Sequence, residues 1–279
     1  MLDEYSDYYS EAAQIFSRYG SSLASIGFHG QKQALEVFCL MTISLCESHA
    51  KAVSVLLKND CGVEPIIVIR GLFEVFCNSF WVSRTDSTVE QNERLFRLEA
   101  TPYREIVKEL RLIQKDVHSA SPYWKEKEYE QLMALVENVA EKCPWLLNLP
   151  SSDPLNFKQA PPLTDRLGET MRLRFYHLYR FSSVFTHPTP MMKAVFIHPA
   201  GSNLKRNEVI EEPLQQFLAY GLWFLKLNLH FCQQVFSACD TERTPLRTEY
   251  YNSMCAVVEK GRKNYFSFRE PGTGGVQSP

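Results

Sequence analysis

The stretch Glu64–Trp81, EPIIVIRGLFEVFCNSFW, decides the fold class of this chain. Its apolar residues occupy almost every face of a helix, and Pro65 stands in the first turn, where its missing N–H costs little. A helix that is apolar all round is usually buried by other helices. The stretch therefore predicts the central helix of a bundle, with Arg70 and Glu74 as its only charges after the first turn.

Helical periodicity continues on both sides of this stretch. Apolar residues recur at steps of three and four from about 31 to 58, up to a turn at Asn59–Gly62. Further helices are predicted over about 2–26, 165–187, 208–239 and 245–262, and a more polar helical span over 88–142. The chain has no Asn-Gly or Asp-Gly hairpin turn and no long β-branched alternation. It is predicted to be all-α, a multi-helix bundle of roughly seven or eight helices.

Two proline-rich loops interrupt this pattern, at 143–163 and 187–207. Both separate helices rather than independent cores, so a single helical domain is expected over 1–265, with its core at about 31–240. The tail 266–279, rich in Gly and Pro, is expected to be disordered.

Composition narrows the class of protein. The 30 basic and 32 acidic residues give a net charge of −2, and no DNA-binding motif occurs, so global charge gives no reason to expect nucleic acid. A local basic patch stays open. The acidic N-terminus does not resemble a signal peptide, and no uninterrupted apolar run of about 18 residues occurs. Most of the eight cysteines stand in apolar helical runs. These features predict a cytoplasmic protein with reduced thiols and no membrane partner.

Arg70 and Glu74 are four residues apart and so share one helix face. Charges in such an apolar helix are costly to bury unless they are paired. One interpretation is therefore a structural ion pair that fixes the helix register. The other is a functional pair that faces an internal polar cavity.

Tyr176, Arg180, Ser183 and His187 recur at steps of four, three and four, so they lie on one helix face. An arginine can bind a phosphate through its forked donors, and a histidine can act as a general acid or base near neutral pH. The set is thus suited to a phosphodiester. A histidine just before Pro188 is equally suited to ending a helix without any chemistry.

No metal or other cofactor is expected. The usual spacings of metal-ligating His, Cys and Glu residues do not occur, nor do the glycine-rich phosphate loops or the Gly-x-Ser-x-Gly element.

Two short motifs carry a family resemblance over about 30–195. Arg70–Glu74 (RGLFE) and Tyr179–Pro188 (YRFSSVFTHP) resemble an uncharacterised all-helical bacterial family with an Arg-x3-Glu helix and a Ser-x3-His-Pro helix end. More loosely, Arg180-x6-His187 is similar to the Arg-x4–6-His signature of the HEPN superfamily. Those helical bundles include many dimeric, metal-independent ribonucleases of defence and toxin systems. Phe181 departs from that signature, because active members carry a small polar residue there.

The HEPN resemblance implies RNA as the partner, a homodimer, and catalysis by Arg180 and His187. In that hypothesis Tyr176, Ser183, Arg70 and Glu74 line or support the site. The alternative hypothesis is a non-catalytic helical protein that binds a ligand or serves as an adaptor for another partner.

Overall fold

The computed structural model describes residues 2–24, 33–61, 63–98, 134, 159–186, 206–237 and 244–269. Its named helices are α1 (Leu2–Ala24), α2 (Gln33–Lys58), α3 (Glu64–Ser83), α6 (Leu163–Arg166), α7 (Gly168–Thr186), α9 (Arg206–Ser237) and α10 (Thr244–Arg269). Residues 88–98 are also helical, and no strand occurs within these ranges. The predicted all-α class is confirmed.

The chain divides into two compact units. Unit 1 comprises Met1–Phe80 and Leu163–Pro279, and unit 2 comprises Trp81–Pro162. Unit 2 is therefore an insertion in the sequence of unit 1. The single domain expected over 1–265 stays a prediction. Most of the two proline-rich loops and residues 270–279 lie outside the described residues, while α10 continues four residues past position 265.

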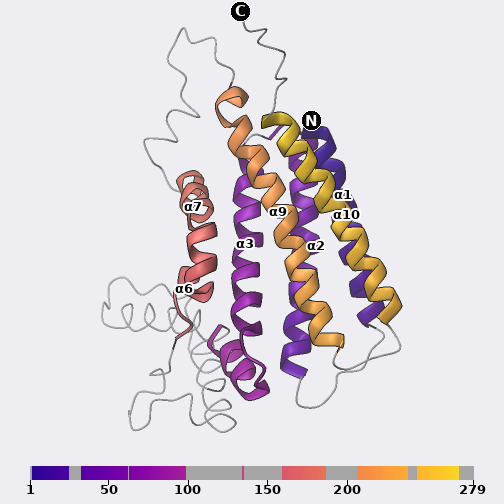
Figure 1. Ribbon diagram of the computed structural model, residues 1–279, viewed down its shortest axis with the longest axis vertical. Helices are drawn as coiled ribbons and strands as arrows, with labels where there is room; N and C mark the ends of the chain where they lie inside the picture. The colour runs from indigo at the N-terminus through magenta and orange to yellow at the C-terminus, as the bar shows by residue number, and fades with distance from the viewer. Residues whose placement is uncertain are drawn as a thin grey trace, which may run out of the picture. The chain divides into compact units, whose positions relative to one another are not determined.

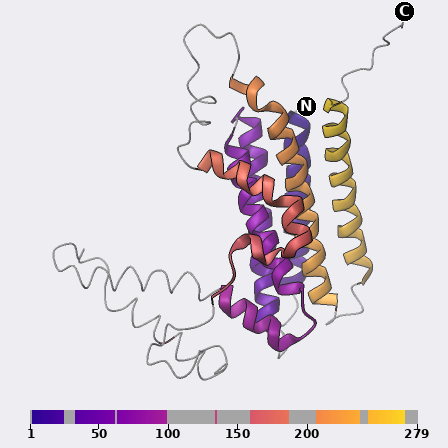
Figure 2. The same cartoon turned by 60° about the vertical axis from the view of Figure 1, so that its left-hand side comes forward.

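In unit 1, helices α1, α2, α9 and α10 lie side by side (Figures 1 and 2). Buried hydroxyl groups connect them at close approaches. The Tyr5 hydroxyl donates to the Gly261 carbonyl at 2.7 Å, and the Tyr9 hydroxyl donates to the Leu218 carbonyl at 2.8 Å. A tyrosine can be buried in this way at little cost, because its ring packs against apolar neighbours while its hydroxyl forms a hydrogen bond.

Helix α3 packs against three other helices of unit 1, in keeping with its apolar circumference. Gly71 lets the His49 ring of α2 approach closely, and Gly221 of α9 approaches Ile69. On the side facing α7 and α9, aromatic rings fill the space with centroids 5.1–5.7 Å apart: Phe73, Phe76, Phe175, Trp223 and Phe224. Such pairs stabilise a core beyond their buried area, so α7 is attached chiefly through rings.

By length and composition, α3 and the Ala34–Lys58 part of α2 could each span a bilayer. Charged residues interrupt the apolar sequence of both helices, for example Glu47 in α2 and Arg70 in α3. Of the most apolar window of each helix, 39% is buried in α2 and 50% is buried in α3. A core helix of a soluble bundle has the same composition, so these helices do not decide the location. The cytoplasmic location and the lack of a membrane partner stay predictions.

Helix α2 ends at Lys58, as predicted, whereas the helix that contains Gly168 differs from expectation. At the predicted Asn59–Gly62 turn, the residue with the left-handed backbone is Asp60, with φ 53°. The N–H of Cys61 bonds to the Leu56 carbonyl and that of Asp60 to Leu57, which is a Schellman motif. The helix predicted over 165–187 is instead broken after Arg166, where Gly168 has φ 69°, a conformation open to glycine.

The described cysteines are free thiols. Cys39, Cys46, Cys77 and Cys232 are buried, and burial raises the pKa of the first three, which keeps them protonated. Their burial in helix interiors agrees with the interpretation from sequence.

Candidate functional site

The polar edge of α3 is built by residues four apart, Arg70, Glu74 and Asn78. The Arg70 Nε donates to Glu74 Oε1 at 3.2 Å. The arginine side chain is 18% exposed but the glutamate side chain is 45% exposed. The pair is therefore only partly buried, because its carboxylate reaches solvent.

Helix α7 presents Tyr179 to this edge. The guanidinium of Arg70 lies over the Tyr179 ring, 5.0 Å from its centre, and the Phe73 ring lies 6.2 Å from the same ring. The hydroxyls of Ser182 and Ser183 both donate to the Tyr179 carbonyl, at 2.9 Å and 2.8 Å. A cation over an aromatic face is attractive, so this contact fixes Tyr179 against α3.

Arg166, in the short helix α6, is a member of this edge that the sequence did not reveal. Its guanidinium donates to the Asn78 side-chain oxygen. Burial lowers the pKa of Arg166, while the neighbouring Cys77 and Glu74 oppose that change. Glu74 thus interacts with two guanidinium groups, those of Arg70 and Arg166. The break at Gly168 is the local feature that separates Arg166 from α7.

Tyr176 and Arg180 lie together on the exposed face of α7. The Arg180 Nη1 donates to the Tyr176 hydroxyl at 3.3 Å, and the guanidinium lies 5.8 Å from the centre of that ring. This hydrogen bond raises the pKa of Arg180, so the side chain stays cationic. An exposed cation on a fixed helix can receive an anionic group without rearranging the core.

Arg70 and Glu74 lie on α3, whereas Tyr176, Arg180 and Ser183 lie on α7. Tyr179 and Arg180 are successive residues of α7, so their side chains point about 100° apart around the axis. Ser183, four residues after Tyr179 and three after Arg180, lies between these two directions. His187 lies outside the described residues, which end here at Thr186. Its proximity to Arg180 stays a prediction.

Phe181, the departure from the HEPN signature, has a packing role. Its ring stacks on Phe217 of α9, with centroids 5.6 Å apart and an interplanar angle of 27°. A small polar residue there would lose this contact between α7 and α9.

Among the residues that the structure describes, no group of three or more His, Cys, Asp and Glu side chains could hold a metal ion. The sequence has a short basic cluster at 203–207 (NLKRN), but it lies almost wholly outside the described residues, and none of its side chains is described.

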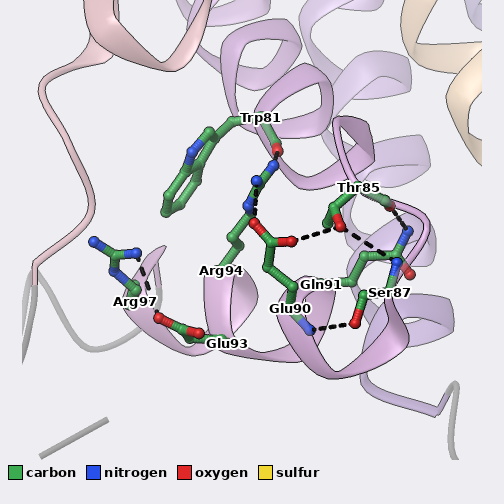
Figure 3. Close-up of polar contacts among 8 residues, drawn as sticks. All are labelled: Trp81, Thr85, Ser87, Glu90, Gln91, Glu93, Arg94 and Arg97. Carbon is green, nitrogen blue, oxygen red and sulfur yellow. Dashed lines mark hydrogen bonds and ion pairs between the residues drawn. The ribbon is translucent and has the colours of Figure 1, made fainter.

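A second polar cluster belongs to unit 2 (Figure 3). Arg94 and Arg97 both lie over the Trp81 ring, at 5.7 Å and 5.4 Å from its centre. Arg94 also pairs with Glu90, and Arg97 donates to the Gln159 carbonyl at 2.9 Å. Trp81 is where the chain enters unit 2, and Gln159 lies just before it leaves. The cluster therefore ties the two ends of the insertion together, which is a structural role.

Comparisons with known proteins reach a family but no activity. A family model described as a family of unknown function (DUF5677) matches residues 36–202, more than half of the chain. No curated protein and no solved structure matches the chain. The matched segment contains both the α3 edge and α7.

Proposed function

Because the chain belongs to this family of unknown function, its activity has to be inferred from its own residues, and we propose that it is a metal-independent ribonuclease. Arg180 and His187 are its catalytic residues in this proposal. Tyr176, Ser183, Arg70 and Glu74 line or support the site. The homodimer that the HEPN resemblance implies, and the cytoplasmic location expected from the composition, belong to the same proposal.

The observation that carries the proposal is the contact between Arg70 and Tyr179. The two motifs that suggested a site are far apart in sequence, yet this contact joins their helices at 5.0 Å. Arg180 follows Tyr179 directly and is exposed, so a phosphate can reach it from solvent. The α3 and α7 motifs thus meet in space, and Arg180 stays exposed beside their contact, which supports a binding site there.

The proposed reaction needs only the RNA itself as nucleophile. His187 removes the proton of a ribose 2′-hydroxyl, the oxygen attacks the adjacent phosphorus, and the bond from phosphorus to the 5′-oxygen breaks. Arg180 stabilises the negative charge that builds up on the phosphate oxygens. The leaving 5′-oxygen takes up a proton. The products are a 2′,3′-cyclic phosphate and a 5′-hydroxyl end.

The test is cleavage of an end-labelled RNA by the purified protein in the presence of EDTA. The variants Arg180→Met and His187→Asn are each expected to lower the rate at least about 100-fold, the usual contribution of a general acid or base. Helix α7 offers a matched control in Arg172→Met and His177→Asn, because both residues are exposed on the same helix and five positions apart. These control variants are expected to cleave like wild type.

The control separates the outcomes. Cleavage that survives both Arg180→Met and His187→Asn would exclude the proposed catalytic pair. Equal losses in the Arg172 and His177 variants would show that α7 is merely sensitive to substitution. Product ends other than a cyclic phosphate and a 5′-hydroxyl would exclude the 2′-hydroxyl mechanism.

One observation favours the alternative, a non-catalytic ligand-binding or adaptor protein. The described polar groups of the site already have partners within the protein, since Arg70 pairs with Glu74, Arg180 with Tyr176, and Ser183 with a backbone carbonyl. Intact RNA with wild-type protein, together with saturable retention of RNA that Arg180→Met weakens, would favour this second function.

A further inference from the structure

Helices α7, α9 and α10 of unit 1 line an open pocket, and none of the predicted site residues belongs to its lining. Its volume is about 260 Å³. Aromatic rings from all three helices form its walls: Phe175, Tyr220, Trp223 and Tyr265. Phe175 is fixed by Trp223 at 5.1 Å and by Tyr220 at 6.1 Å between ring centres. The walls are therefore held by helices that pack against one another.

Two polar groups of the pocket lining have no hydrogen-bond partner within the part of the chain that the structure describes. Among the residues that the structure describes, none forms a hydrogen bond with the Gln216 amide or with the Tyr220 hydroxyl. Both side chains are partly buried. Together they offer donors and acceptors to a ligand inside an otherwise apolar space, as small-molecule sites commonly do.

The charge at the pocket is balanced. Arg262 lines it and is exposed, but its guanidinium makes a bidentate pair with the Glu259 carboxylate, at 2.9 Å and 2.8 Å. A paired guanidinium exerts little net attraction on an anion. The pocket thus has no strong preference for a charged ligand.

We propose that this pocket binds a small, uncharged, planar aromatic compound of two fused rings that carries a hydrogen-bonding group. An apolar cavity of about 150 Å³ is large enough for benzene. The volume here leaves room for a second ring. The rings of Tyr220 and Trp223 offer stacking and edge contacts, and Gln216 pairs with the polar edge of the ligand. The proposal is independent of ribonuclease activity, because none of the proposed catalytic residues takes part.

Indole is a suitable probe because it is neutral and bicyclic and has one N–H donor. Titration of the full chain with 5-fluoroindole, followed by ¹⁹F NMR, is expected to show saturable binding. Ala219→Leu places a larger side chain in the pocket and is expected to weaken binding at least about 10-fold. Gln216→Met keeps the volume but removes the hydrogen bond, which is worth about 1 kcal/mol or a factor of about 5.

Ala256→Leu is the matched control, since it makes the same chemical change at an exposed position of α10. It is expected to bind the probe like wild type, and circular dichroism checks that every variant is folded. Wild-type protein that does not bind, or binding unchanged by both Ala219→Leu and Gln216→Met, would overturn the proposal. So would indole-3-acetate binding more than about 10-fold more tightly than indole, because the site would then select an anion.

Discussion

Arg70 of α3 and Tyr179 of α7 meet as a cation over an aromatic face, with the guanidinium 5.0 Å from the ring centre. The same arginine donates to Glu74, so it is held from two sides. Side-chain contacts, mostly between aromatic rings, hold α7 against α3. The contact of Arg70 with Tyr179 is one of them, so it helps to orient the helix that carries Tyr176, Arg180 and Ser183. The free energy of this cation–π contact can therefore be measured as a property of the proposed site.

A double-mutant cycle with Arg70→Met and Tyr179→Leu is expected to give a coupling free energy of about 0.5–1 kcal/mol, the range for partly exposed cation–π pairs. Urea denaturation of the four proteins measures it. The pair Tyr176 and Arg180, on the exposed face of α7, serves as a comparison with a smaller expected coupling. A coupling of zero between Arg70 and Tyr179 would mean that the contact does not hold α7.

Gly221→Ala is expected to destabilise the protein by about 1–2 kcal/mol, although alanine favours a helix over glycine. The reason is that a Cβ at position 221 would lie 2.0 Å from the Tyr9 hydroxyl. Thermal unfolding measures the change. Adding Tyr9→Phe removes the clashing oxygen, so Gly221→Ala should cost clearly less in that background. Equal costs in both backgrounds would refute the steric explanation.

Asp60→Gly is expected to stabilise the protein by about 0.5–1 kcal/mol, because Asp60 has φ 53° and a negative charge at a helix C-terminus. The greater freedom of glycine in the unfolded chain offsets part of the gain. Asp60→Asn removes the charge alone and shows which cause dominates. A loss of stability in the glycine variant would show that the Asp60 side chain has a role of its own.

The stability contributed by Glu90 should depend on pH. The hydrogen bond from Thr85 and the pairing with Arg94 lower the pKa of Glu90 in the folded state. This contribution is therefore complete above the unfolded pKa of about 4.3 and is lost as the pH falls through the lower, folded value.

The urea midpoint of Glu90→Gln should accordingly lie below that of wild type at pH 7, and the gap should narrow below about pH 4. Glu249→Gln, at an exposed position of α10, controls for the loss of a surface charge. A gap that is constant from pH 7 to pH 3 would contradict the role of the carboxylate charge.

The sequence predicted most described helices to within a few residues, because apolar residues at steps of three and four lie on the buried face of a helix. The segment predicted at about 31–58 is α2, Gln33–Lys58, and that at 208–239 is α9, Arg206–Ser237. Helix α3 begins at Glu64, as its proline predicted, and ends two residues beyond Trp81. A periodic pattern of this length leaves little freedom for another element.

Features that depend on backbone conformation or on distant residues were not predicted. The break at Gly168 falls inside a helical pattern, and no sequence signal marked Asp60 as a residue with a left-handed backbone after α2. Arg166 had no sequence signal, because its partner Asn78 lies in another helix. The site was thus predicted as two separate motifs, and only the fold shows that α3 and α7 meet.

The pairing of α1 with α10 governs when unit 1 can finish folding on the ribosome. Tyr5 bonds to Gly261, and Lys260 pairs with Glu11 at 2.9 Å. Translation at about 5–20 residues per second places roughly 10–50 s between the synthesis of these helices. Until α10 is made, the Tyr5 hydroxyl and the Glu11 carboxylate of α1 lack these partners. Polypeptides that end before α10 are therefore expected to expose the surface of α1 that α10 covers in the folded chain.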